Sequence, residues 1–120
     1  MPDEFDDKLN VLYKGQVEII ESGVFRTWLD DLRDRRARVR INDRLRRLAD
    51  GHAGDAKPVG EGVQELRLHF GPGYRIYFMW QEDVLVILLN GGDKDSQFRD
   101  IAKAREMARE IRDGFEIVSF

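Results

Sequence analysis

The six residues 84–89, VLVILL, are apolar at every position. A strand with no polar position has both faces covered or lies centrally in its sheet, whereas a strand with one face in water alternates. Two segments before it, 63–70 and 74–80, do alternate, and the turn-forming residues 71–73 and 81–83 separate the three. The pattern predicts an antiparallel meander whose third strand lies in the middle of the sheet.

Helical spacing dominates the sequence before this meander. Apolar residues recur every three or four positions in residues 25–48, which predicts an α-helical hairpin that bends near residues 34–37 and ends at Gly51. Residues 11–20 contain a period of two instead, typical of a first strand, and Gly23 marks the break after it.

Residues 51–60 are rich in glycine, contain a proline and show neither period, so we expect a loop there. Beyond the meander, residues 101–111 have helical spacing up to Gly114, with Asp95 or Ser96 well placed as N-cap.

The tail, residues 115–120, reads FEIVSF and is predicted to form a short last strand. The chain of 120 residues has no linker-like stretch, so we expect a single domain over 1–120. The fold class is therefore α+β, with an N-terminal strand, an α-helical hairpin, an antiparallel sheet meander and a C-terminal helix.

Composition excludes several kinds of chemistry. The chain has no cysteine and two histidines, His52 and His69, too few for a zinc site, and no Walker-type or dinucleotide loop occurs, so we expect neither metal nor cofactor. Residues 1–10 are acidic, and no apolar run approaches the roughly 20 residues that span a bilayer. We expect no membrane partner and a cytoplasmic location.

Positive charge is concentrated in one part of the chain. Residues 26–47 contain nine arginines and four aspartates, although the net charge of the whole chain is -3. The planar guanidinium group binds phosphate or carboxylate through paired hydrogen bonds, so either RNA or an acidic protein segment fits this surface. A solvated helix face with Asp/Arg pairs is the alternative interpretation.

A second cationic group is predicted on the meander. If the turn at residues 71–73 pairs Phe70 with Tyr74, apolar side chains share one face of the two strands and polar side chains the other. The polar face then gathers Glu65, Arg67, His69, Arg75 and Tyr77, with Arg67 opposite Tyr77 and His69 opposite Arg75. Two neighbouring arginines require an anion, which is either a carboxylate such as that of Glu65 or a bound phosphate.

The residues GGDK at 91–94 follow the apolar strand and lead into a helix. Unpaired N–H groups at a helix N-terminus attract anions, and Lys94 would reinforce such a site.

Three segments together resemble a known family: FRTWLDDLRD, RINDRLRRLADGHAGDAKPVGEGVQELRLHFGPGYRIYF and VLVILLNGGDKDSQFRDIAKAREMA. Over about residues 25–109 the chain is similar to the RelE/ParE superfamily and, within it, to the HigB-like addiction module killer proteins. The resemblance implies a RelE-like fold and the toxin of a type II toxin-antitoxin system, neutralised by a cognate antitoxin that we expect to be a helix-turn-helix protein. In RelE-like members the activity is ribosome-dependent cleavage of mRNA, without a metal.

The resemblance also implies which residues act. Such endoribonucleases drive attack of the ribose 2′-hydroxyl on the adjacent phosphate, which needs proton transfer and cations. The expected catalytic residues are Arg67, Arg75, Lys94 and Tyr77, the expected RNA-binding residues are Lys57, His69, Arg40, Arg44 and Arg47, and the expected supporting residues are Asp93 and Gln97. Lys94 or Lys57 would serve in proton transfer, and His69 is an alternative base.

Two other functions fit the same features. A ParE-like toxin would inhibit DNA gyrase without a nuclease site, and a catalytically silent module would only bind the antitoxin through its arginines and exposed strands. A tyrosine near the C-terminus that serves some RelE toxins has no counterpart in residues 114–120.

Overall fold

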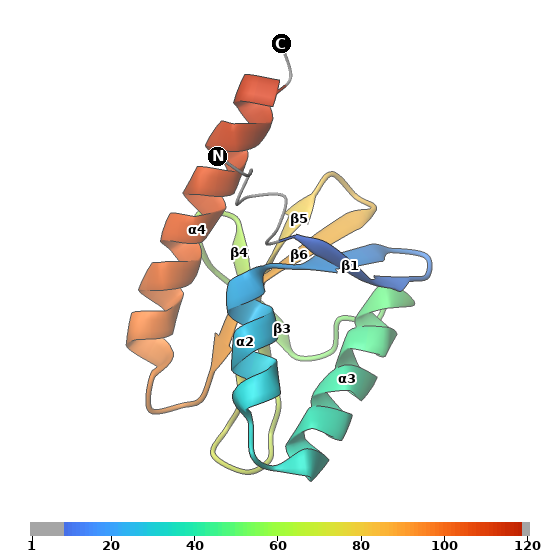
Figure 1. Cartoon of the computed structure of the whole chain (residues 1–120), viewed down its shortest axis with the longest axis vertical. Helices are drawn as coiled ribbons and strands as arrows, with labels where there is room; N and C mark the ends of the chain where they lie inside the picture. The colour runs from blue at the N-terminus through green and yellow to red at the C-terminus, as the bar shows by residue number, and fades with distance from the viewer. Residues whose placement is uncertain (1–8, 119–120) are drawn as a thin grey trace.

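The computed structural model describes the backbone of residues 9–118 and the side chains of residues 9–114. Within these residues three helices and six strands follow one another along the chain (Figure 1). In chain order they are β1 (Asn10–Lys14), β2 (Glu18–Glu21), α2 (Gly23–Asp31), α3 (Arg35–Ala49), β3 (Ala56–Gly60), β4 (Val63–Arg67), β5 (Arg75–Gln81), β6 (Leu85–Gly92) and α4 (Gln97–Val118).

All six strands belong to one sheet with the order β1-β2-β6-β5-β4-β3. Strands β3 to β6 form the antiparallel meander, while β2 pairs with β6 in parallel. The apolar strand β6 therefore has a neighbour on each side, which confirms its predicted central position. The α+β class is confirmed as well.

Helices cover both faces of the sheet, as the uniformly apolar β6 requires. Leu66, Ile76 and Leu88 belong to the core that lies under α2 and α3. Tyr77 and Ile87 belong to a second core, under α4. Figure 1 shows α4 at the left of the sheet and α3 at the right. Successive residues of a strand point to opposite faces, so β5 and β6 contribute to both cores.

The predicted helical hairpin is confirmed, and each of its helices has a side-chain cap. The Ser22 hydroxyl accepts a hydrogen bond from the Phe25 N–H at 3.0 Å. A carboxylate oxygen of Asp34 accepts bonds from the N–H groups of Arg36 at 2.9 Å and Ala37 at 3.4 Å. Such caps satisfy donors that the first helical turn leaves free, and each contributes about 1 kcal/mol. The predicted bend is thus the junction of α2 and α3.

The prediction of one strand within residues 11–20 was wrong, because this segment is the hairpin β1–β2. The chain reverses where Gly15 lies against the end of α3: a Cβ added to Gly15 would be 2.7 Å from the Ala49 carbonyl oxygen. The Val17 N–H donates to the same oxygen at 2.9 Å. A tertiary contact therefore decides this turn, and Gly23 opens α2 instead of ending a strand.

The predicted loop at residues 51–60 is also partly wrong, since β3 occupies its second half. Proline cannot donate a backbone hydrogen bond and is therefore confined to edge strands within sheets. Pro58 meets this condition because β3 is the outermost strand. The sequence rule against strands at proline is valid for central strands and misleads at an edge.

The tail does not form the predicted strand, because α4 continues past Gly114 to Val118. Gly114 faces open space, so no neighbouring group forces the helix to end there. Residues 119 and 120 of the predicted strand lie outside the described residues. At its other end α4 begins directly after Ser96, whose carbonyl accepts from the Asp100 N–H at 2.9 Å, in line with the predicted start.

Candidate functional site

The β4–β5 loop, residues 68–74, sets the register of the two strands that carry most candidate residues. The Leu68 N–H donates to the Tyr74 carbonyl at 2.9 Å, and Arg67 lies opposite Arg75. The predicted pairing of Phe70 with Tyr74 was therefore wrong by two residues. The Gly73 N–H donates to the Phe70 carbonyl at 3.1 Å, so a tight turn forms within a longer loop.

A shift of two residues leaves every side chain on its predicted face, because the side-chain period of a strand is two. The shift places the two arginines directly opposite one another instead of opposite Tyr77 and His69. Two like charges side by side repel, and a buried acid, Glu65, compensates this repulsion.

Glu65 is fully buried and accepts hydrogen bonds from four side chains. Its Oε1 accepts from Nε of Arg67 at 3.2 Å and from Nη1 of Arg75 at 3.4 Å. Its Oε2 accepts from the Tyr77 hydroxyl at 3.2 Å and from Nε2 of Gln97 at 2.8 Å. We call these five residues the Glu65 cluster. They connect β4, β5 and the first turn of α4.

The carboxyl group of Glu65 is ionised. Burial by itself raises its pKa, but the hydrogen bonds from Gln97, Arg67 and Tyr77 and the charge of Arg75 outweigh burial and lower the pKa. Hydrogen bonds to the charged form of an acid have this effect. Glu65 therefore supplies a fixed negative charge between two guanidinium groups.

The two arginines keep donors free for a ligand. The side chain of Arg67 is 31% exposed and that of Arg75 12%. Nε of Arg75 is buried and has no hydrogen-bond partner within the described chain. One carboxylate also leaves the pair with an excess of one positive charge.

A hollow of about 530 Å³ opens beside these arginines. Its lining brings together four predicted site residues, Arg67, His69, Arg75 and Lys94, with Leu68 and residues 70–73 of the β4–β5 loop and one acid, Asp95. Ligand pockets commonly measure about 300 to 1,000 Å³. The hollow is thus large enough for one nucleotide unit.

Lys94 reaches this hollow because two loops approach closely. Its N–H donates to the Pro72 carbonyl at 3.3 Å, and a Cβ added to Gly73 would be 3.3 Å from Cβ of Lys94. Gly73 also has a φ of 79°, in the left-handed region that glycine adopts most easily. Both loops lie at the lower end of the molecule in Figure 1.

Tyr77 lies beneath the hollow and is fully buried. Burial raises the pKa of its hydroxyl, and the charge of Glu65 and the hydrogen bond to it raise it further. A hydroxyl that is buried and held by a carboxylate remains protonated at any physiological pH. Tyr77 is therefore linked to the guanidinium groups of Arg67 and Arg75 only through Glu65.

The two predicted supporting residues occupy different positions. Gln97 belongs to the Glu65 cluster. Oδ1 of Asp93 accepts from the N–H groups of Asp95 at 2.9 Å and Ser96 at 3.1 Å, so Asp93 holds the start of α4. The Asp93 carboxylate thus binds N–H groups before α4 that we expected to attract an external anion.

The glycines of the expected anion-binding turn have another role. Gly91 and Gly92 belong to β6. A Cβ on Gly91 would lie 2.4 Å from the Trp28 ring, and one on Gly92 would lie 1.8 Å from a carboxylate oxygen of Asp100. Close packing on both faces of the sheet explains why both positions are glycine, and only Lys94 of this motif lines the hollow.

Two candidates lie at the border of the site. Lys57 is exposed on β3 opposite Glu65, hence on the same face of the sheet, but it does not line the hollow. The exposed ring of His69 donates from Nε2 to Oδ2 of Asp55 at 2.5 Å. This hydrogen bond lowers the pKa of Asp55.

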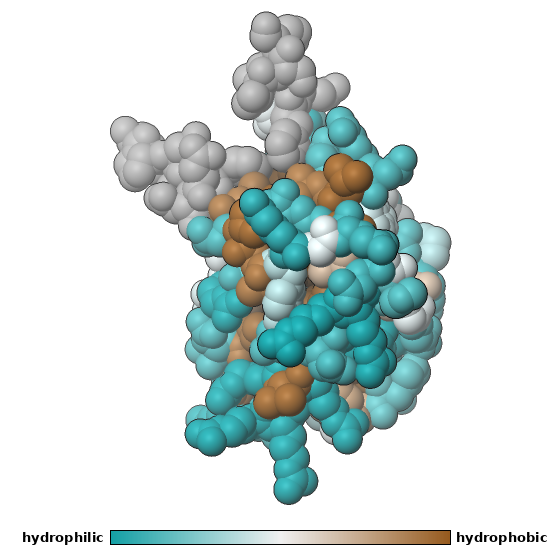
Figure 2. All heavy atoms as spheres, turned by 90° about the vertical axis from the view of Figure 1, so that its right-hand side faces the viewer, coloured by the Kyte–Doolittle hydropathy of each residue, from teal (hydrophilic) through white to brown (hydrophobic). Residues whose placement is uncertain are grey.

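A second hollow of about 500 Å³ lies between α3 and the β4–β5 loop, and His69 and Phe70 line both hollows. We call its predicted RNA-binding side chains, Arg40, Arg44 and Arg47, the α3 arginine face. Figure 2, which faces the side of the molecule that carries α3, shows mainly hydrophilic side chains there.

The three arginines of this face differ in their contacts. Arg40 lies over the Phe70 ring at 4.8 Å, and Arg47 pairs with Asp43 at 3.1 Å. Arg44 donates to the carbonyls of Arg67 at 3.0 Å and Ala53 at 3.1 Å, and burial lowers its pKa. Arg44 therefore ties α3 to the end of β4, a role that its place in an arginine-rich stretch did not reveal.

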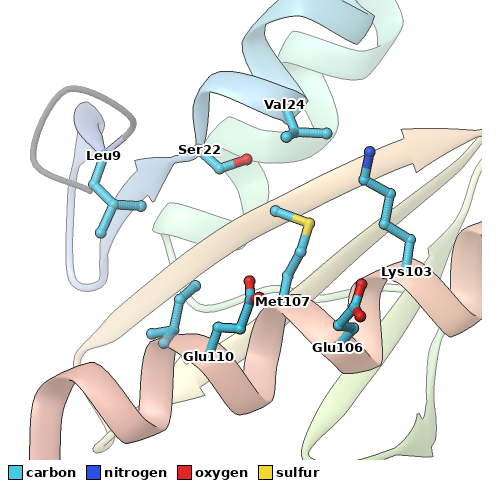
Figure 3. A pocket seen from close by; sticks show the side chains of 8 residues that line it. Leu9, Ser22, Val24, Lys103, Glu106, Met107 and Glu110 are labelled. Carbon is cyan, nitrogen blue, oxygen red and sulfur yellow. The ribbon is translucent and has the colours of Figure 1, made fainter. Parts of the chain in front are cut away.

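Another hollow, of about 310 Å³, lies between α4 and the start of α2 (Figure 3). Its lining is apolar around Leu9, Val24 and Met107, while Lys103 and Glu106 lie along its α4 side. It has no cluster of cations, so it does not suit a phosphate ligand.

The described residues contain neither a membrane-spanning helix nor a metal-binding cluster. None of the helices is long and apolar enough to cross a membrane. No group of three or more metal-ligating side chains occurs in the part of the chain that the structure describes.

Comparison with known proteins places the chain among relatives. Residues 27–112 match the family model described as Phage derived protein Gp49-like (DUF891). A Haemophilus influenzae protein (strain ATCC 51907 / DSM 11121 / KW20 / Rd), described as "Uncharacterized protein", is 45% identical over 95 residues, which are 79% of this chain and 96% of that protein. The family match includes both arginine groups and Lys94.

Proposed function

The chain belongs to the phage-derived Gp49-like family, a family of addiction-module toxins of the RelE/HigB-like type II class, and from this premise we propose that it is a toxin that cuts mRNA on the ribosome. It acts in the cytoplasm without a metal ion, and a cognate antitoxin, a helix-turn-helix protein, neutralises it. The partner antitoxin agrees with the association of the family with toxin-antitoxin systems.

One observation carries the ribonuclease proposal. Two arginines lie opposite one another on neighbouring strands, a single buried carboxylate fixes both, and Lys94 lines the same hollow. Positive charge held in place before the substrate arrives stabilises a charged transition state at little reorganisation cost. A gyrase inhibitor or a passive binding module has no need for such an arrangement.

In the proposed reaction the ribose 2′-oxygen attacks the adjacent phosphorus and the bond from phosphorus to the 5′-oxygen breaks. The products are a 2′,3′-cyclic phosphate and a free 5′-hydroxyl. Arg67 and Arg75 bind the non-bridging oxygens and stabilise the charge of the phosphorane. Lys94 gives a proton to the leaving 5′-oxygen.

The proton of the 2′-hydroxyl needs an acceptor, and His69 is suitably placed on the rim of the hollow. Because Nε2 of His69 donates to Asp55, Nδ1 carries a free lone pair and can accept the proton of the 2′-hydroxyl. Tyr77 and Gln97 act indirectly, by holding Glu65. The α3 arginine face and Lys57 bind RNA phosphates outside the reacting group.

The test is a map of message ends by primer extension after brief induction, with and without an inhibitor of translation. The native chain should cut within codons only while ribosomes translate. Arg75→Ala and Lys94→Ala should abolish the cuts. Arg109→Ala is the matched control, because Arg109 is an exposed arginine whose partner is Glu61 of the β3–β4 turn.

Circular dichroism and thermal melting of each variant would confirm that it folds. Growth arrest by the native chain with all messages intact would overturn the ribonuclease proposal and leave a protein target, such as DNA gyrase.

A further inference from the structure

Phe98 has the most exposed large apolar side chain in the part of the molecule that the structure describes, at 91%. It lies in the first turn of α4. Phenylalanine is normally among the most buried residues, because water forms no favourable contact with its ring. This exposed ring follows directly after Gln97, which reaches the Glu65 cluster, so it is available to contact a ligand bound there.

The position of Phe98 on α4 follows from its neighbours. Gln97 points toward the sheet, since its amide donates to Glu65 at 2.8 Å. The next residue is turned by about 100° around the helix axis, which takes Phe98 off the packed face. The first turn of α4 lies in the lower part of Figure 1, toward the β4–β5 loop. Lys94, three residues before the start of α4, lines the hollow together with that loop.

Residues farther along α4 show which way this flank faces. Arg105 and Arg109 follow Phe98 by seven and eleven positions, so all three share one stripe of the helix. The guanidinium of Arg105 packs against Gly60, and Arg109 pairs with Glu61 at 3.4 Å. The stripe therefore faces the β3–β4 side of the sheet, the side on which Lys57 is exposed.

The surroundings of the ring favour RNA over an apolar protein segment. The other strongly exposed apolar side chains lie on β1, on α3, at the end of β5 and in the turn after it. Phe98 therefore belongs to no apolar patch of the described residues, and the charged side chains that line the hollow are mainly cationic: Arg67, Arg75 and Lys94 against the single acid Asp95. Single-stranded RNA binds to such combinations: cations bind its phosphates and an aromatic ring stacks on a base.

We propose that Phe98 is the stacking platform for an unpaired nucleobase next to the phosphate bound by Arg67, Arg75 and Lys94. The proposal rests on the function proposed above and adds to it a contact that recognises a base. Stacking on Phe98 would hold the RNA strand in an extended, unstacked form. The 2′-hydroxyl of one nucleotide then faces the phosphate of the next.

The test uses a short single-stranded RNA with 2′-O-methyl groups, which cannot be cut, and with 2-aminopurine at successive positions. Stacking on an aromatic ring quenches 2-aminopurine fluorescence. The native chain should quench the probe at one position, and Phe98→Ala should abolish quenching and weaken binding about tenfold, within the range known for base–aromatic stacking. Phe98→Tyr should restore both, whereas Phe98→Leu should not.

Two controls separate this proposal from the proposed function. Arg109→Ala should leave quenching and binding unchanged. The melting temperature of the Phe98 variants should not fall, because the Phe98 side chain is 91% exposed. If the native chain cuts messages and all Phe98 variants bind and cut equally, the stacking proposal fails and the ribonuclease stands. If the native chain cuts nothing but Phe98 governs quenching, the ribonuclease fails and the platform stands.

A third outcome concerns the antitoxin. Co-expression with the antitoxin should rescue growth equally well for the native chain and for a Phe98→Leu variant that is still toxic. If RNA binding is unchanged and rescue is lost in Phe98→Leu, the ring belongs to the antitoxin interface and the stacking proposal is overturned.

Discussion

The Glu65 cluster and the α3 arginine face both concentrate arginines, but they hold them in opposite ways. In the cluster one fully buried carboxylate accepts four hydrogen bonds from side chains of β4, β5 and α4. On α3, Arg47 is 63% exposed and pairs with Asp43 one helical turn away. An exposed pair of this kind contributes about 0 to 1 kcal/mol and exchanges readily with water.

The difference shows where geometry is fixed before a ligand binds. The cluster fixes both guanidinium groups relative to each other, so a phosphate that fits gains their charge without first ordering them. Arg47 of the α3 arginine face is held only by an exposed pair, so in the proposed function it adapts to the RNA and adds a general attraction that salt screens. Catalysis needs the first kind of site, and capture of a long polyanion needs the second.

The largest effect should come from removing the acid at the centre of the cluster. In Glu65→Ala the nearly buried Arg75 has no counter-charge, and breaking a buried ion pair in this way costs about 3 kcal/mol. Urea unfolding would measure the loss. Glu65→Gln, which keeps the shape and an acceptor, should lose less. If Glu65→Ala were as stable as the native chain, the cluster would not be the rigid region that we describe.

Next in size is the effect of Arg75→Ala on cleavage. Loss of one preorganised donor to a developing negative charge typically lowers the rate about 10²- to 10³-fold. Arg47→Ala should lower cleavage far less, because its contribution is to general RNA attraction. Single-turnover cleavage on programmed ribosomes would compare the two. Equal losses in both variants would erase the distinction between the regions.

Acid should weaken the cluster. The folded-state pKa of Glu65 lies below its ordinary value of 4.5, so the unfolded chain binds the proton more tightly. The stabilisation that the Glu65 carboxylate contributes is therefore fully present above the pKa that Glu65 has in the unfolded chain. It is lost as pH falls through the lower pKa of Glu65 in the folded chain. Unfolding free energies at pH 7 and pH 3 should differ less in Glu65→Gln than in the native chain, and an equal difference would refute this role.

Tyr77→Phe should have a smaller effect, about 1 kcal/mol of stability, because it removes one of four hydrogen bonds to Glu65. Cleavage should fall only modestly, since the hydroxyl is buried beneath the hollow. A loss of cleavage as large as that of Arg75→Ala would instead make Tyr77 a catalytic residue. Thermal melting together with the cleavage assay separates the two results.

The smallest effect on stability is expected for Arg47→Ala, within about 0.5 kcal/mol, because exposed pairs contribute little. Its signature should be a reduced dependence of RNA binding on salt, since one phosphate contact is lost. Fluorescence anisotropy over a salt series would measure the slope. Arg44→Ala should instead lower stability, because Arg44 holds two backbone carbonyls.

The sequence alone determined the elements whose periodicity is local. The apolar run of β6 implied a covered central strand, and the period of two placed Glu65, Arg67, Arg75 and Tyr77 on one face even though the predicted register was two residues off. Helical spacing identified α2, α3 and most of α4. These features depend on neighbouring residues in the chain, so a pattern of a few residues is enough to predict them.

Only the tertiary structure decided contacts between residues distant in the chain. Gln97 reaches Glu65 from 32 positions away, Lys94 meets Pro72, and Gly15 turns the chain against Ala49. The edge position of β3, which tolerates Pro58, is likewise a property of the assembled sheet. Such contacts depend on how loops and layers pack, which no local period encodes, and they connect the two predicted arginines to one buried carboxylate.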